Sequence, residues 1–213
     1  MERAKQFYEE YFSQKWYTNT FLVRSPHQIA RVVDGAREWN NINDSGCNFV
    51  CLAMIVGMDP ARLASILARR RYFYAEAGTV AKRLNGSTGR LIADDNAPNA
   101  ARPIVSLGKC WVSLWRRPVT ITLALVGIES NVEYEAARQL VTRARRDGLH
   151  VICGPSHHAL LVAGQIGRDY YLWDPDASSR SLDRHLAGAY RLQQLFVKSE
   201  AIEFWLYRAE FVS

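Results

Sequence analysis

The sequence has few cysteines and no long hydrophobic run. Its longest apolar stretches, 49–58 and 121–128, are far shorter than the roughly 20 residues that a helix needs to cross a bilayer, so we expect no membrane span. Four cysteines are too few for a disulfide scaffold, and they are typical of reduced thiols, although one pairing among them stays open. They are Cys47, Cys51, Cys110 and Cys153.

Three further features are lacking: a signal peptide, internal repeats and a Gly/Ser-rich linker. Residues 1–16 mix polar, acidic and aromatic side chains, unlike the apolar core of a secretory signal. We therefore expect a cytoplasmic protein, or one exported without a classical signal. Apolar residues are spread along all 213 positions, which favours a single domain over 1–213. A chain of this size buries roughly 70% of its surface on folding and needs no structural metal.

Positive charge is in modest excess, with 27 Lys and Arg against 21 Asp and Glu, a net charge of +6. Part of the excess lies in clusters at 69–71, 116–117 and 143–146. No RNA-binding, helix-turn-helix or zinc-finger pattern accompanies them, so we interpret them as solvated surface and expect no nucleic-acid partner.

The first half of the chain has the periodicity of helices. Aromatic spacing predicts a helix over 1–17, and a second follows over 26–39. The turn-forming run 40–46 predicts a loop, after which the apolar stretch 47–57 predicts a short buried helix that begins at Cys47. Asp59 as N-cap and Pro60 in the first turn predict another helix, which runs to about Arg71. Residues 78–103 are rich in Gly, Asn, Asp and Pro and are expected to be irregular.

The second half favours strands. The pattern predicts a strand over 119–126 and a helix over 132–146 that stops at Asp147-Gly148. Further strands are expected at 149–153, 159–163, 170–173 and 202–209, with a hairpin turn over 164–169. Helices followed by a mainly antiparallel sheet indicate an α+β fold.

One set of residues suits nucleophilic catalysis. Cys47 lies at a predicted helix N-terminus, where partial positive charge and free N–H groups stabilise a thiolate. His158 opens an apolar strand and can act as the base, since imidazole titrates near neutrality. Asp174 ends the next hairpin strand, which folds back toward His158 and can orient the imidazole. An enzyme of this kind requires a partly exposed Cys47.

Alternative interpretations exist for each of these residues. Cys47 can be a small buried hydrophobic residue, and Cys51, one helical turn further on, is expected in the core. His157 becomes the base if its strand starts one residue earlier, because side chains alternate between the faces of a strand. Asp176 is the alternative to Asp174. A metal site made of Cys47, Cys51, His157 and His158 is conceivable, but structural zinc more often uses closely spaced loop cysteines.

Two sequence blocks resemble a known family. DSGCNFVCLAMI (44–55) and HALLVAGQIGRDYYLWDPD (158–176) are similar to the papain-like cysteine peptidases, in particular their C39-like branch. The resemblance implies a papain-like fold, with Cys47 as nucleophile, His158 as general base and acid, and Asp174 as the orienting acid. The family places an oxyanion-hole Gln six residues before the nucleophile, where this chain has Asn41. It also commonly has Asp before and Gly after the nucleophile, whereas this chain has Gly46 and Asn48.

The function implied by this resemblance is that of a cysteine-dependent hydrolase, and a peptidase first of all. It would act on a protein or peptide through a thioester and needs no cofactor or metal. Protein glutamine deamidases and transglutaminases use the same chemistry, and bacterial toxins and translocated effectors include both. A papain-like domain that has lost catalysis and binds a partner is the non-enzymatic alternative, motivated by Asn at the oxyanion position.

Overall fold

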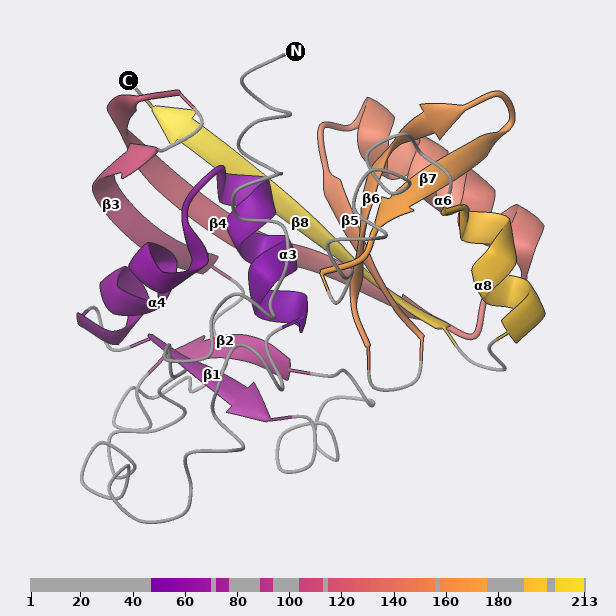
Figure 1. Cartoon of the computed structure of the whole chain (residues 1–213), viewed down its shortest axis with the longest axis horizontal. Helices are drawn as coiled ribbons and strands as arrows, with labels where there is room; N and C mark the ends of the chain where they lie inside the picture. Colours follow the sequence, from indigo (N-terminus) through magenta and orange to yellow (C-terminus); the bar gives the residue numbers. More distant parts are fainter. Residues whose placement is uncertain are drawn as a thin grey trace.

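The computed structural model describes residues 47–69, 72–76, 89–93, 104–112, 115–155, 158–175, 190–198 and 202–212. These residues form an α+β fold, the class that the sequence predicts, with a six-stranded antiparallel sheet in the order β3-β4-β8-β5-β6-β7 (Figure 1). The strands of the sheet are β3 (Ile104–Val112), β4 (Arg117–Ser130), β5 (His150–Pro155), β6 (Leu160–Ile166), β7 (Asp169–Trp173) and β8 (Ile202–Val212). The helices predicted over 1–17 and 26–39 and the loop over 40–46 lie outside the described residues.

The buried helix predicted to begin at Cys47 is confirmed as α3 (Cys47–Val56). Every residue from Phe49 to Val56 is buried, which accounts for a helix that is apolar on all sides. Its end is set by Gly57, which adopts a φ of 66°. The N–H groups of Gly57 and Met58 donate to the carbonyls of Met54 and Ala53, the pattern of a Schellman cap.

The next helix, α4 (Pro60–Arg69), is also confirmed, together with its N-cap. The Asp59 carboxylate accepts a hydrogen bond of 2.8 Å from the backbone N–H of Arg62, which satisfies one of the free donors of the first turn. The remaining predicted residues, Arg70 and Arg71, lie outside the described part of the chain.

The prediction of an irregular segment over 78–103 is wrong for its central part. Gly89–Ala93 forms β2, which pairs antiparallel with β1 (Tyr72–Glu76) in a separate two-stranded sheet. Turn-forming residues on either side of β2 mask its strand pattern in the sequence. Its partner β1 is not predicted as a strand from the sequence either. The other residues of 78–103 are outside the described part.

The predictions for the second half are confirmed, with longer strands than expected. The predicted strand 119–126 is the middle of β4, and α6 (Tyr134–Arg146) ends at Asp147 and Gly148. The last strand, β8, extends to Val212. Two elements were not predicted, the strand β3 and the short helix α8 (Leu192–Lys198).

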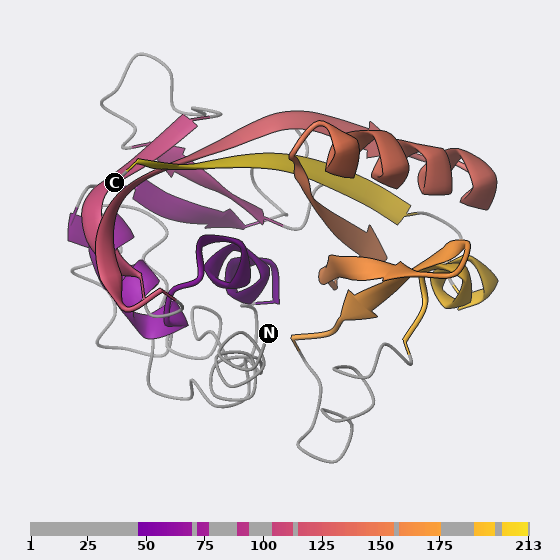
Figure 2. The same cartoon turned by 90° about the horizontal axis from the view of Figure 1, so that it is seen from above.

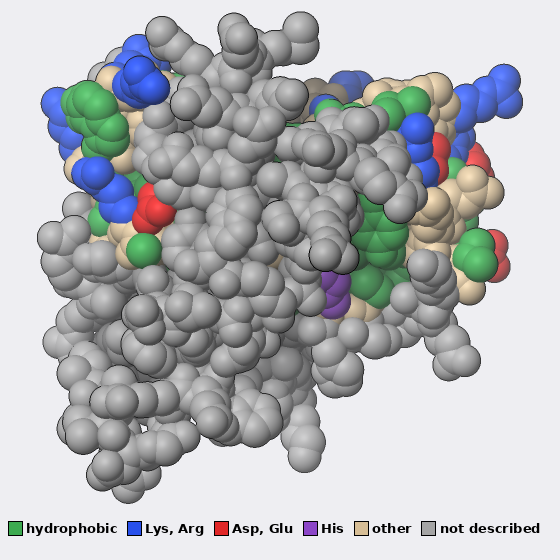
Figure 3. Space-filling model, viewed as in Figure 1, with side chains coloured by type: hydrophobic (Ala, Val, Ile, Leu, Met, Phe, Trp, Pro, Cys, Tyr) green, Lys and Arg blue, Asp and Glu red, His purple; other side chains and the backbone are tan. Residues whose placement is uncertain are grey.

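The sheet is packed on both faces (Figure 2). Adjacent residues of one strand point to opposite faces, so Trp205 joins a cluster with α3 and α4 while Phe204 joins a cluster with α6 and α8. On β6, Leu161 likewise belongs to the cluster with α3 and α4, and Leu160 to the cluster with α6 and α8. Around these clusters, described Lys and Arg side chains lie toward both ends of the face in Figure 3. Within the described residues, no helix combines the length and the apolar character that crossing a bilayer requires.

Candidate active site

The β6–β7 hairpin brings His158 and Asp174 to the same edge. Its strands are joined by the two-residue turn Gly167-Arg168, with Ile166 opposite Asp169 and Leu161 opposite Trp173. Gly167 adopts a φ of 60°, a value that glycine reaches without a steric penalty. His158 lies two residues before β6 and Asp174 directly follows β7, so the hairpin brings both residues to the same edge.

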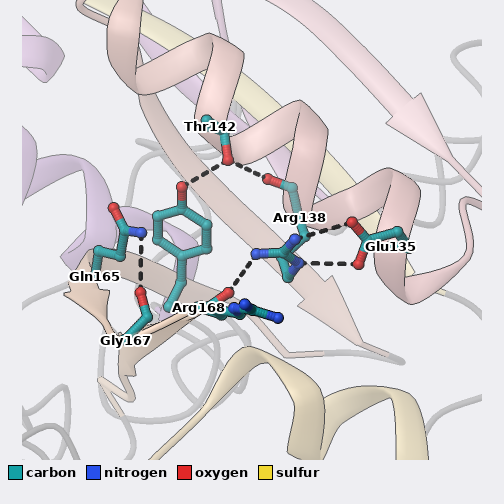
Figure 4. Close-up of polar contacts among 7 residues, drawn as sticks. Glu135, Arg138, Thr142, Gln165, Gly167 and Arg168 are labelled. Carbon is teal, nitrogen blue, oxygen red and sulfur yellow. Dashed lines mark hydrogen bonds and ion pairs between the residues drawn. The ribbon is translucent and has the colours of Figure 1, made fainter.

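Local hydrogen bonds fix the backbone and the outer end of this hairpin. The N–H of His158 donates to the carbonyl of Pro155 at 2.9 Å, which closes the connection from β5. At the turn, the Arg138 guanidinium of α6 donates to the carbonyl of Arg168 and pairs with Glu135 at 2.9 Å (Figure 4). The hairpin is therefore anchored to α6 at its turn, far along the strands from His158.

His158 and Asp174 form a close ion pair. The Nε2 atom of His158 lies 2.6 Å from Oδ1 of Asp174, and the side chains are 28% and 22% exposed. A charge-assisted hydrogen bond of this length is strong when it is partly shielded from water. This confirms that the two residues are neighbours.

Cys47 completes the group. The helix α3 packs against β5 and β6, and in Figures 1 and 2 the Cys47 end of α3 faces the ends of β6 and β7. The Cys47 thiol lies near enough to His158 to raise the pKa of its ring. Because Asp174 occupies Nε2, the Nδ1 atom of His158 is the nitrogen left for the thiol.

These contacts govern the protonation of His158. Burial lowers the pKa of His158, but hydrogen bonds to Asp174 and Cys47 and the charges of both residues outweigh that effect and raise the pKa to about 10. His158 is therefore an imidazolium at neutral pH, flanked by two groups that stabilise the positive charge.

Cys47 is less exposed than the sequence interpretation required. Its exposed fraction is 8%, so it counts as buried rather than partly exposed. It is the first residue of α3, and the N–H groups of a helical first turn have no partners within the helix. The sulfur therefore lies at the positive end of the helix dipole, in a site with little access for water.

The other three thiols have different surroundings, and all four are free of disulfides. Cys51 is fully buried one turn deeper in α3, where burial, followed by the charges of Cys47, Cys153 and Asp174, raises its pKa. Burial also raises the pKa of Cys153, whose thiol lies 3.5 Å from the carbonyl oxygen of Leu160. The thiol of Cys110 lies 3.4 Å from the carbonyl oxygen of Gly108. Cys51 is thus a core residue, as predicted.

Three residues named from the sequence lie outside the described part of the chain: Asn41, His157 and Asp176. The structure therefore brings together Cys47, His158 and Asp174 of the predicted set. Among the described residues, no group of three or more His, Cys, Asp or Glu side chains is arranged to hold a metal ion.

Tyr190 is a neighbour of the site that the sequence interpretation missed. Burial raises the pKa of its hydroxyl, and the charges of Asp174 and Cys153 raise it further. Tyr190 reaches this position because its carbonyl accepts a hydrogen bond of 2.9 Å from the N–H of Leu172 in β7. No local signal marks it, since the contact depends on a segment that returns to the sheet edge.

Comparison with known proteins gives no relative. No protein-family model matches the chain, and neither a curated protein nor a solved structure matches it. The functional argument therefore depends on the geometry of Cys47, His158 and Asp174.

Proposed function

We propose that the chain is a cysteine-dependent hydrolase of papain-like architecture, with a peptide bond as its first candidate substrate. The observation that carries this proposal is His158, held at 2.6 Å by Asp174 and near enough to the Cys47 thiol for that thiol to raise the pKa of the ring. A nucleophile, a base and an orienting carboxylate in contact are the components of a catalytic triad.

In the first step, Cys47 attacks the substrate carbonyl carbon. At the moment of attack the thiol proton is on the His158 ring, and the sulfur forms the new bond to the carbonyl carbon. The tetrahedral oxyanion that forms is stabilised by the Cys47 N–H at the start of α3 and by the amide of Asn41. His158 then donates its proton to the leaving amine, and the C–N bond breaks to give a thioester.

In the second step, water hydrolyses the thioester. Neutral His158 takes a proton from the attacking water, and a second oxyanion forms at the same carbon. Its collapse releases the carboxylic acid and the Cys47 sulfur, and the proton on His158 restores the resting pair. Asp174 keeps the ring oriented through both steps. None of the steps requires a cofactor.

The packing of the other thiols supports Cys47 as the nucleophile. Cys51 is fully buried in the same helix, and Cys153 lies within the sheet against Leu160. Of the three, only Cys47 has both a helix N-terminus and an imidazole in contact.

The test compares Cys47→Ala with Cys51→Ala on an unfolded protein substrate in the presence of a labelled primary amine. Mass spectrometry distinguishes new chain termini, glutamine converted to glutamate, and incorporated amine, which identify a peptidase, a deamidase and a transglutaminase. We expect new termini from the wild type and from Cys51→Ala, and none from Cys47→Ala. If deamidation or amine incorporation is seen instead and is lost in Cys47→Ala, the proposed triad stands, but its substrate is a glutamine side chain rather than a peptide bond.

A wild-type protein with none of the three activities would contradict the hydrolase. The domain would then be the non-catalytic alternative, which binds a partner at this face. Full activity in Cys47→Ala would also overturn the proposal, because the thioester cannot form without the sulfur.

A further inference from the structure

The end of the sheet where β3 turns into β4 exposes two tryptophans. The last residue pair of the hairpin joins Val112 to Arg117. Trp111 on β3 is 43% exposed, and Trp115 in the turn is 38% exposed. Tryptophan is among the largest apolar side chains, and two exposed at one turn form a feature that monomer stability does not explain.

The strand pattern forces Trp111 outward. Cys110 and Val112 on either side of it are buried in the cluster beneath α3, so Trp111 points away from that cluster. It lies opposite Pro118. Val212, which is 63% exposed, lies opposite Thr120, two residues along β4 from Pro118. Trp111, Pro118 and Val212 therefore lie on the same face of the sheet at this end.

Trp115 is held in place at the turn. Its ring lies edge-on to Phe211 with 4.5 Å between the centroids, and the Arg117 guanidinium lies 6.0 Å above the ring. Arg116 has a φ of 51°, a left-handed turn conformation. The turn thus presents an aromatic ring and two arginines from a backbone fixed by the hairpin.

Charge at this end is mainly positive. Arg116, Arg117 and Lys109 are exposed beside the tryptophans, and Glu210 is the exposed described acid on the neighbouring part of β8. Figure 3 shows hydrophobic side chains surrounded by Lys and Arg over β3 and β4. We define the aromatic tip as Lys109, Trp111, Trp115, Arg116 and Arg117.

We propose that the aromatic tip docks on the surface of an anionic phospholipid bilayer. Tryptophan rings favour the interface between headgroups and acyl chains, and arginine and lysine bind acidic headgroups. The aromatic tip offers both at one end of the β3–β4 hairpin. A specific protein partner would need roughly 800 Å² of complementary surface on this side, whereas a bilayer needs only the projecting side chains.

Docking by the aromatic tip leaves the Cys47 site free. In the sheet order, β8 and β5 separate the β3–β4 hairpin from β6 and β7, which flank His158 and Asp174. The aromatic tip does not depend on the proposed catalysis, so either proposal can fail without the other.

The test measures co-sedimentation of the full chain with vesicles of phosphatidylcholine alone, or with about one third phosphatidylserine. The decisive variant is Arg116→Glu with Arg117→Glu. Its matched control is Arg145→Glu with Arg146→Glu, which makes the same change in net charge on the exposed end of α6. Trp111→Ser is compared with Val197→Ser, because Val197 is an exposed apolar residue of α8, 82% exposed.

We expect wild-type binding to the anionic vesicles only, weakened by salt. Each basic group at such a surface contributes about fivefold in affinity, so losing two arginines should weaken binding by roughly 25-fold or more. Trp111→Ser should weaken it as well, and the two controls should bind like the wild type. Equal loss in both charge variants would mean that net charge alone acts. That outcome would overturn the proposal, and so would a wild type that does not bind anionic vesicles. Variants of the aromatic tip that change only the oligomeric state, or only the binding of soluble polyglutamate, would overturn it as well.

Discussion

His158 and Asp174 lie on opposite arms of one hairpin, 16 residues apart, with 2.6 Å between Nε2 and Oδ1. The hairpin brings them to one edge, because a two-residue turn at Gly167 pairs β6 with β7, and His158 lies two residues before β6 while Asp174 directly follows β7. With Cys47 on the other side of the ring, this pair raises the pKa of His158 to about 10. The imidazolium is therefore a consequence of the fold.

Replacing Asp174 with Asn removes the negative charge but keeps the shape of the side chain. The pKa of His158 should fall below about 10, because one of the groups that stabilise its positive charge is lost. Hydrolysis by Cys47 should slow by up to about 10⁴-fold, as expected for a mis-oriented imidazole. An NMR titration of the His158 ring and the initial rates measure the two effects.

The matched control is Asp147→Asn, at the C-cap of α6, which should leave both quantities unchanged. An unaltered His158 titration in Asp174→Asn would show that the ion pair does not govern the ring.

Stability should depend on pH through His158. The pKa of His158 is raised in the folded protein from its ordinary value of 6.5 to about 10, so the folded state binds this proton more tightly than the unfolded state. The stabilisation is complete below pH 6.5 and is lost as the pH rises toward about 10. Urea unfolding of the wild type and His158→Gln across this range measures it.

The difference in the free energy of unfolding between these two proteins should shrink as the pH rises. Subtracting the variant removes the contribution of Cys51 and Cys153, whose pKa values are raised by burial in both proteins. A difference that stays constant or grows with pH would contradict the raised pKa.

Gly154 allows a close approach between β5 and the ring of Trp205. A Cβ at this position would lie 2.2 Å from the Trp205 ring, closer than real contacts permit. Gly154→Ala should lower the free energy of unfolding by about 1–3 kcal/mol, the usual cost of overpacking a core. Trp205→Phe should relieve part of this cost, so the double variant should lose less than the sum of the single variants. Strictly additive losses in urea unfolding would place the strain elsewhere.

Local sequence signals predicted the elements that carry the three central residues. The caps of α3 and α4 are local, since Gly57 and Asp59 act within a turn of their own residues. The hairpin could also be predicted, because its strands adjoin a short turn. From these elements alone, Cys47, His158 and Asp174 could be named.

Non-local pairing explains what the sequence did not reveal. The strand β2 forms by pairing with β1, and β3 forms by pairing with β4, to which it is joined at the aromatic tip. Tyr190 reaches Asp174 because its segment returns to the edge of β7. The low exposure of Cys47 is likewise set by packing from distant segments, which no motif around the cysteine records.

The central claim, a reactive pair of Cys47 and His158, is tested most directly by alkylation of the native protein with iodoacetamide. Mass spectrometry reads the rate at each of the four cysteines near pH 6 in the wild type, in His158→Ala and in the control His150→Ala. Cys47 should react first. Losing His158 should slow it by about tenfold or more, since the imidazolium no longer stabilises the thiolate, while losing His150 should not. If Cys47 stays unmodified in the native protein, or reacts equally fast without His158, the pair does not exist and the hydrolase account is wrong.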